Sequence, residues 1–355
     1  ERVKARWAEV GDEIDAVTIT ANIPLRVGLG VDGEDEKALT DLIGRHRAGI
    51  GNRWAWAGAI FGDSQTALYR AMCGLFLPVD SAWLFDGYSR GDPWDLYDST
   101  TTSRAFQEAG IETVVHDIPA NRVRDWRRAA AGGLETDLIL VNSKGTVGFF
   151  QLGDGKAYPG DTPLLDIPAA MHIVHSWSAR VPDSPRSVAG RWLEHGVYAY
   201  YGSIDEPYLS AFVPTPKLAG RMLVGFPFGV AVRVDGGPPW KLNVLGDPLI
   251  TFNPGSTAGS RIAQPVPINP SEDLADTSAA ALKAGEYAEG IREMVLAGRD
   301  ADVARLARAM IDQRPENVSN AVARAALLSL YREGHHLTMA KAFALLSPDD
   351  QKILL

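Results

Sequence analysis

The chain has 355 residues, of which 46% are hydrophobic, and its formal net charge is −9. This length favours a main domain with a smaller second one, and the apolar content allows a sizeable core. An acidic chain repels phosphate backbones, so we expect no nucleic-acid partner, and no stretch reaches the roughly 20 apolar residues of a transmembrane helix. The single cysteine, Cys73, rules out an intrachain disulfide and a zinc site built from thiolates.

Over the first two thirds of the chain, short apolar segments alternate with segments that have the apolar spacing of a helix. β-Branched and aromatic residues predict the strands, and glycines mark several helix ends. Strands are predicted at 16–25, 54–62, 81–88, 111–119, 136–145, 171–179 and 197–203, and helices at 63–77, 100–110, 122–133 and 186–196. This alternation predicts an α/β fold with a mostly parallel sheet, covered by helices on both faces.

A segment rich in proline and polar residues then ends the alternation, and the rest of the chain has helical patterns only. The sequence therefore predicts an N-terminal segment 1–11, an α/β domain 12–262, a linker 263–275 and a small all-helical domain 276–355. The helical domain would be a bundle or a set of helical repeats, and it is a candidate surface for a protein partner.

One stretch carries a family resemblance. The segment GVYAYYGSIDEPYLSAF at 196–212, followed by KLNVLGDPLITF at 241–252, resembles the C-terminal half of the gingipain-like, caspase-fold peptidases of clan CD. The resemblance covers roughly residues 135–252. It implies a caspase-like, flavodoxin-like sheet in which the end of one strand supplies a catalytic His before a Gly, and the end of the next supplies a catalytic Cys.

The two catalytic positions that the resemblance implies are occupied by other residues. Lys144 stands before Gly145 where the family has His, and His175 or Ser176 stands where it has Cys. Cys73 lies far earlier, in an apolar helical segment, where we expect a buried and inert thiol. The resemblance thus implies a gingipain-like domain that lacks the catalytic pair.

Ligands of open α/β sheets bind beyond the carboxyl ends of the strands. The turns after three predicted strands would meet there if those strands are neighbours. The predicted binding edge therefore consists of Asn142, Ser143, Gly145, Ser203, Asp205, Glu206 and Asp247.

Two hydrolase schemes remain as alternatives to a site without catalysis. In the first, a desolvated Lys144 acts as the base for a nucleophilic Ser176. A pair formed by His175 and Ser176 is disfavoured, because neighbours in a strand point to opposite faces.

In the second hydrolase scheme, the Gly-Asp-Ser of IFGDSQT resembles the nucleophile block of the GDSL lipases and esterases, which would make Ser64 the nucleophile. The later blocks of that family are absent from the sequence, so we expect Asp63 or Ser64 to cap a helix instead.

The sequence thus favours a catalytically degenerate domain that works in binding or in the assembly of a protein complex. We expect a protein partner, a possible larger assembly and no cofactor. We also expect no metal, since His335 and His336, and likewise Asp205 and Glu206, lack a nearby third ligand. Exported, periplasmic and cytoplasmic locations all remain allowed.

Overall fold

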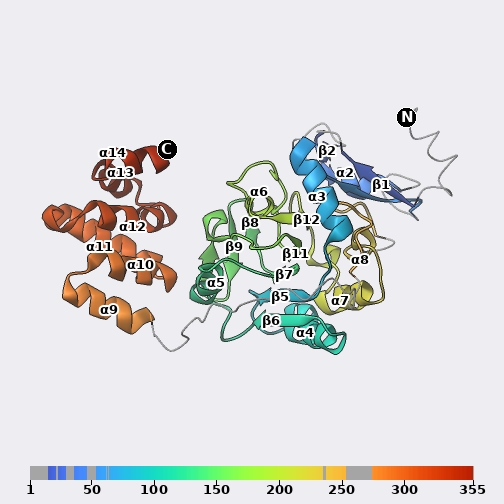
Figure 1. Ribbon diagram of the computed structural model, residues 1–355, viewed down its shortest axis with the longest axis horizontal. Helices are drawn as coiled ribbons and strands as arrows, with labels where there is room; N and C mark the ends of the chain where they lie inside the picture. Colours follow the sequence, from blue (N-terminus) through green and yellow to red (C-terminus); the bar gives the residue numbers. More distant parts are fainter. Residues whose placement is uncertain are drawn as a thin grey trace. The chain divides into compact units, whose positions relative to one another are not determined.

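The chain divides into two compact units (Figure 1). The first comprises residues 1–122 and 129–260, and the second comprises 123–128 and 261–355. Within these limits the computed structural model describes residues 15–20, 23–28, 36–45, 53–60, 62, 64–234, 237–252 and 274–354.

Strands and helices alternate through the first part of the chain, as the sequence pattern predicts. The strands are β1 (Ala16–Ile19), β2 (Arg26–Gly28), β3 (Glu36–Ala38), β4 (Trp56–Ala59), β5 (Ser81–Asp86), β6 (Glu112–His116), β7 (Leu138–Asn142), β8 (Gly145–Thr146), β9 (Phe149–Leu152), β10 (Gly155–Ala157), β11 (Ala169–Val174), β12 (Val197–Ser203) and β13 (Leu242–Leu245). The helices between them are α2 (Leu39–Leu42), α3 (Ser64–Phe76), α4 (Ser99–Glu108), α5 (Val123–Ala130), α6 (Val188–Glu194), α7 (Thr215–Leu223) and α8 (Phe228–Ala231).

Eight strands form one sheet in the order β1-β4-β13-β12-β11-β7-β5-β6. At its centre β7, β11 and β12 are parallel neighbours, with His172 of β11 between Leu140 of β7 and Tyr201 of β12. All paired strands in this sheet are parallel except β12 and β13. The prediction of a mostly parallel sheet is confirmed, and the antiparallel pair means that β1, β4 and β13 run opposite to the other five strands.

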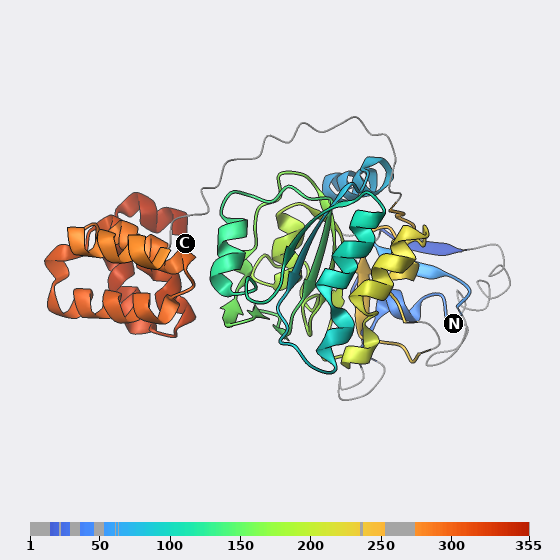
Figure 2. The same ribbon diagram turned by 90° about the horizontal axis from the view of Figure 1, so that it is seen from below.

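The central strands β7, β11 and β12 are buried along their whole length, because helices cover both faces of the sheet. Seen along the sheet, α4 and α7 lie on one face and α6 on the other (Figure 2). The core on the α4 side joins Leu84, Leu138 and Leu140 to Phe106 of α4 and Leu218 of α7.

Side-chain caps fix two of these helices. Asp98 accepts hydrogen bonds from the backbone amides of Thr100 and Thr101 at the start of α4, and Ser187 accepts one from Gly190 at the start of α6. A single turn of 3₁₀ helix directly before Asp98 begins at Trp94. The cap of α4 therefore also fixes the position of Trp94 beyond the end of β5.

The second unit is helical, with α9 (Leu274–Ala284), α10 (Tyr287–Leu296), α11 (Asp300–Gln313), α12 (Asn320–Arg332), α13 (His336–Ala344) and α14 (Pro348–Leu354). Successive helices from α9 to α13 pack as neighbours, and α10 also contacts α12. Asp300 at the start of α11 accepts hydrogen bonds from Ser329 and Arg332 of α12, which ties these two helices together.

The small C-terminal helical region of the predicted fold is thus present. The predicted segment 1–11 and nearly all of the predicted linker 263–275 lie outside the described residues, so the domain boundaries stay predictions. Across the described ranges, no helix is both long and apolar enough to span a membrane.

Candidate functional site

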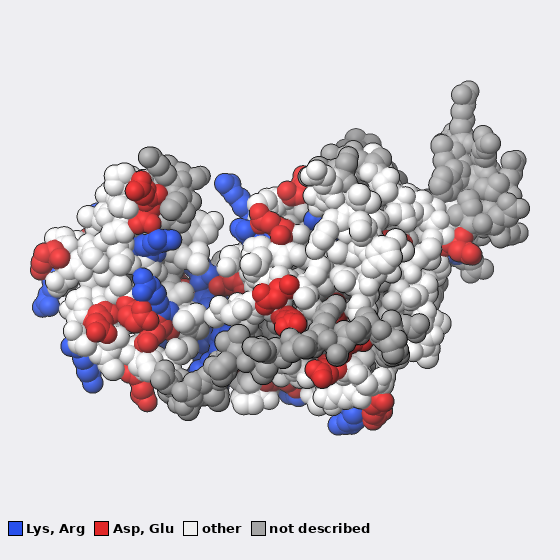
Figure 3. Space-filling view, in the orientation of Figure 1, with Lys and Arg blue, Asp and Glu red and all other residues white. Residues whose placement is uncertain are grey.

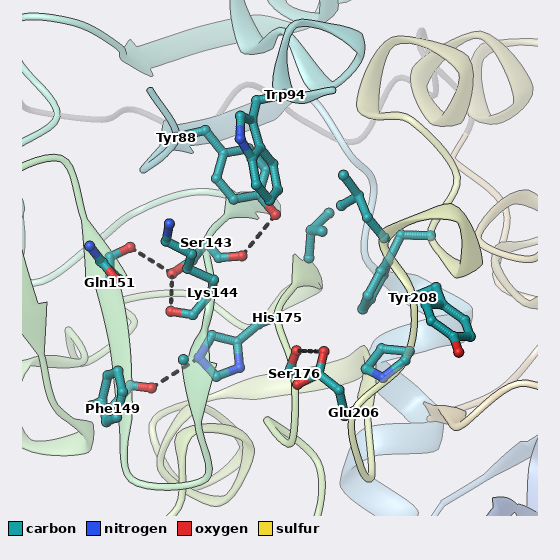
Figure 4. Close-up of a pocket in the computed structure, with 15 residues that line it drawn as sticks. Tyr88, Trp94, Ser143, Lys144, Phe149, Gln151, His175, Ser176, Glu206 and Tyr208 are labelled. Atoms are coloured by element: carbon teal, nitrogen blue, oxygen red, sulfur yellow. Dashed lines mark hydrogen bonds between the residues drawn. The ribbon is translucent and has the colours of Figure 1, made fainter. Parts of the chain in front are cut away.

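A cavity of about 510 Å³ opens beyond the carboxyl ends of β7 and β11 (Figure 4). We call it the cleft. It is lined by the ends of these two strands, by the β8–β9 hairpin, and by the loops after β5 and β12. The lining residues include Ser143, Lys144, Gly145, His175, Ser176, Phe149, Gln151, Tyr88, Trp94, Glu206 and Tyr208. The fold thus brings together residues from three predicted strand ends that lie far apart in the sequence.

β11 ends at Val174, five residues before the end of the predicted strand 171–179. His175 and Ser176 therefore lie in the turn beyond the strand. Neighbouring side chains of a strand point to opposite faces of the sheet, but this rule does not apply to two residues in a turn. The turn is tight, since Trp177 has a φ of 56°. Few residues other than glycine adopt this left-handed conformation without a stabilising contact. The indole Nε1 of Trp177 supplies one, because it donates a 2.6 Å hydrogen bond to Asp205.

His175 occupies one of the two positions where the family resemblance places a cysteine, and its ring is buried. Its Nε2 lies 3.0 Å from the carbonyl oxygen of Phe149 in β9, so the neutral ring donates its proton there. Nδ1 is also buried and has no partner among the described residues. Burial lowers the pKa of His175 to about 4, which keeps the imidazole neutral at physiological pH.

Ser176 and Glu206 form the polar contact at the open side of the cleft. The Ser176 hydroxyl donates a 2.9 Å hydrogen bond to Oε1 of Glu206, in the loop after β12 (Figure 4). Lys144 has a different neighbour, because its Nζ lies 5.7 Å from the centre of the Trp94 ring. The contacts of the structure therefore pair Ser176 with Glu206 and place Lys144 over an aromatic face.

Ser143 and Asn142 hold the end of β7 in place. The Ser143 hydroxyl donates to the carbonyl oxygen of Gln151 at 2.7 Å, and the Tyr88 hydroxyl donates to the Ser143 carbonyl oxygen at 2.8 Å. Asn142 points away from the cleft into a buried network, where its amide donates to the Tyr97 carbonyl oxygen and accepts from Thr215. Its predicted place on the binding edge is therefore wrong, because the core satisfies both ends of its side chain.

Ser203 and Asp205 act as supports for the loop after β12 and do not line the cleft. The buried Ser203 hydroxyl donates to the carbonyl oxygen of Lys241 at 3.1 Å. Asp205 accepts from Trp177 and also from Nζ of Lys241, at 2.9 Å. Although partial burial opposes it, these hydrogen bonds lower the pKa of Asp205. The loop that carries Glu206 is thereby fixed to the turn that carries Ser176.

Two other candidates lie at the opposite edge of the sheet. Asp247 follows β13, which runs antiparallel to β12, so its expected place on the binding edge is wrong. It accepts a hydrogen bond from the amide of Leu249 within its own turn, as its sequence suggests. Ser64 opens α3 after β4, a strand that is parallel to β13, so it too is remote from the cleft. The side chain of Ser64 and all of Asp63 lie outside the described residues.

Cys73 is buried in α3, as the sequence predicts. Burial raises the pKa of its thiol, which disfavours the thiolate form that nucleophilic attack requires. No group of three or more His, Cys, Asp or Glu side chains that could hold a metal ion occurs within the described ranges.

The aromatic walls of the cleft are the part that sequence reasoning missed. Tyr88 and Trp94 lie against each other with ring centres 4.4 Å apart, and Phe149 and Tyr208 line two other sides. Each of these four aromatic residues lies in the loop after a strand or begins a short strand, outside the segments that carry the polar residues of the cleft. In the sequence, the one feature that marks them is an aromatic residue close to the end of a strand.

No protein-family model and no curated protein matches the chain. Among solved structures, the chain is similar to the Arg-specific cysteine proteinase gingipain R. The TM-score is 0.50 and the identity 13%, over 71% of this chain and 67% of that one. The α/β unit has the gingipain fold. A complex of the Porphyromonas gingivalis RgpB pro- and mature domains gives the same TM-score, at 14% identity over 71% of this chain and 69% of that one. At such identities the likeness to gingipain concerns the fold alone.

Proposed function

We propose that the cleft binds an extended segment of a protein partner without cleaving it, and that the chain thereby takes part in assembling a protein complex. The observation that carries this proposal is the state of His175. His175 is one of the two residues that the sequence resemblance places where a gingipain-like peptidase has its nucleophile, and its imidazole is buried and neutral, with Nε2 already bonded to Phe149. A side chain held in this way can support the cleft but cannot attack a peptide bond.

The remaining groups also fit binding better than hydrolysis. A serine nucleophile needs a base within hydrogen-bond reach, and the partner of Ser176 is the Glu206 carboxylate. A carboxylate is a weak base toward an alcohol, so this hydrogen bond orients the hydroxyl more than it activates it. The second solved neighbour is a complex of pro- and mature domains, which is a precedent for this fold engaging another domain.

Charge indicates which segments the cleft would accept. Lys144, in the wall of the cleft, contacts the Trp94 ring, and the exposed Lys156 of β10, which is not among the lining residues, contacts the ring of Phe149 with Nζ 4.3 Å from its centre. Within the described residues, neither lysine has a carboxylate partner. A carboxylate that entered between these aromatic rings would gain a charge-assisted hydrogen bond in a partly dehydrated site. We therefore propose that the bound segment carries Asp or Glu, in contrast to the Arg specificity of gingipain R.

Selection from a randomised peptide library tests this proposal. We expect wild-type protein to enrich peptides that contain an acidic residue flanked by apolar ones. The Lys144→Gln variant should bind the selected peptides about tenfold more weakly, which corresponds to the loss of one charged hydrogen bond. Lys217→Gln, which removes an exposed lysine on α7 outside the cleft, is the matched control and should bind like wild type. Lack of any enrichment that depends on Lys144 would count against the proposal.

A hydrolase with Ser176 as nucleophile is the second candidate, because the Ser176 hydroxyl lines the cleft and has a hydrogen-bond acceptor in place. A fluorophosphonate probe, which labels activated serines, separates the two functions. We expect no labelling of wild-type protein above that of Ser176→Ala and Ser64→Ala. Labelling that disappears in Ser176→Ala, together with hydrolysis of peptide substrates, would replace the binding function with a catalytic one.

A further inference from the structure

Helix α3 presents an apolar face to solvent. Its outward side chains are those of Leu68, Tyr69, Met72, Leu75 and Phe76, with exposed fractions between 48% and 72%. We call them the α3 face. In Figure 3 the surface over α3, which Figure 1 shows in the same orientation, carries no Lys, Arg, Asp or Glu colouring. The helix is therefore apolar on the side that carries the buried Cys73 and also on the side that faces solvent.

The spacing of these residues suits helix pairing. Leu68, Met72 and Phe76 are four residues apart and form one ridge, while Tyr69, Met72 and Leu75 are three apart and form a second. Ridges at four-residue spacing interdigitate with those of an identical helix in the commonest class of helix packing. With 13 residues, α3 is about 20 Å long, which is enough for two helices to cross over the whole face.

The face is also neutral, so two copies of it would not repel each other. Arg70 is the one charged residue within α3, and its guanidinium donates to the carbonyl oxygen of Leu193, away from the α3 face. The exposed surface of the five side chains is on the order of 600 Å², at the upper end of what a monomeric protein leaves in one apolar patch. Two such faces would bury about 1,200 Å² if they covered each other completely, which reaches the lower limit of stable protein interfaces.

We infer that α3 is a dimerisation element, and that its exposed face packs against α3 of a second copy of this chain across a twofold axis. A twofold interface needs a surface that complements itself, and a neutral helix with interdigitating apolar ridges meets this requirement. The inference does not depend on the function of the cleft, since α3 follows a strand whose carboxyl end lies at the other edge of the sheet.

Sedimentation velocity over a dilution series tests the dimer. We expect wild-type protein to change from dimer to monomer on dilution, and Leu75→Glu to remain monomeric at every concentration. At concentrations where the wild type is monomeric, the two melting temperatures should agree, because the side chain of Leu75 is 71% exposed in the single chain. Leu164→Glu places the same charge at another exposed apolar position of the first unit and should dimerise like wild type. A wild type that is monomeric throughout, or a dimer that persists in Leu75→Glu, overturns the inference.

A cross-link identifies the contact independently. Met72 lies at the centre of the α3 face, so Met72→Cys in a Cys73→Ala background should form a covalent dimer under mild oxidation. The same cysteine combined with Leu75→Glu should not. If Met72→Cys is instead protected from thiol reagents in a monomeric protein, then another part of the same chain covers the face and the second-copy assignment is wrong.

Discussion

Gly145 lies directly against the ring of His175. A Cβ atom on Gly145 would be 2.7 Å from Nε2 of His175, and it would also overlap the carbonyl oxygen of Phe149 that accepts the imidazole proton. The hydrogen bond between His175 and the hairpin thus needs a residue without a side chain at the start of β8.

Gly145→Ala is therefore expected to destabilise the protein by about 1–3 kcal/mol, the usual range for overfilling a packed site. Chemical denaturation measures the change. Gly148→Ala is the control, because a Cβ at Gly148 would meet no atom within 4 Å. If Gly145→Ala and Gly148→Ala lost the same free energy of unfolding, then His175 and Phe149 would not restrict the residue at position 145 to glycine.

His172 is expected to make the protein sensitive to acid. Its ring is fully buried between Tyr201 and Phe212, and neither ring nitrogen has a partner among the described residues. Burial lowers the pKa of His172 to about 3, so between pH 6.5 and 3 the unfolded chain holds a proton that the folded chain does not. Stability therefore falls as the pH drops through this window, by about 2 kcal/mol at pH 5 for this residue.

His172→Phe keeps the ring stacking and removes the titrating group. Its free energy of unfolding should exceed that of wild type by about 2 kcal/mol more at pH 5 than at pH 8. Urea denaturation at the two pH values measures this difference. A difference between variant and wild type that does not change with pH would contradict the assignment.

Asp86 should have the opposite pH dependence. It is buried at the end of β5 and accepts a hydrogen bond from the Tyr88 amide, and burial raises its pKa to about 6. Between pH 3.8 and 6 the folded chain holds a proton that the unfolded chain has lost, so this contribution to stability disappears as the pH rises.

Asp86→Asn keeps the acceptor for the Tyr88 amide and cannot ionise. Relative to wild type, it should gain about 2 kcal/mol of stability between pH 4 and pH 7. Asp154→Asn, which removes an exposed carboxylate after β9, serves as the control and should show no such trend. An Asp86→Asn variant that is less stable than wild type at pH 7 would show that the buried carboxylate is favourable.

Cys73 is expected to be inert in the folded protein. Its side chain is buried, with 5% of the residue exposed, and burial raises the pKa of the thiol, so iodoacetamide should label it only after unfolding. Cys73→Ala should cost about 1 kcal/mol through lost packing and leave peptide selection by the cleft unchanged. Rapid labelling of native protein, or loss of selection in Cys73→Ala, would contradict this assignment.

The sequence predicts most strands and helices of the α/β unit, because buried parallel strands such as β7 and β12 consist of short apolar runs between helical segments. It does not predict the direction of β13. Strand direction depends on the path of the chain around the sheet, so the pattern alone places Asp247 at the wrong edge.

The polar part of the cleft is predictable from strand ends, but its pairing is not. Sequence spacing suggests Lys144 as the neighbour of Ser176, whereas the loop after β12 supplies Glu206 instead. α3 shows a similar limit, because its apolar residues surround the helix. The sequence therefore does not predict which side of the helix is buried: the side of Cys73 is buried and the side of Leu75 is exposed.

The position of β13 in the sheet has a consequence for how the chain is made. β1 and β4 are synthesised first, yet they join the other strands only through β13, which begins at Leu242. During translation β4 therefore has an unpaired apolar edge until the ribosome has released the chain as far as β13. Such an edge can pair with other nascent chains. We therefore expect fragments that end before Leu242 to aggregate in the cell or to recruit chaperones.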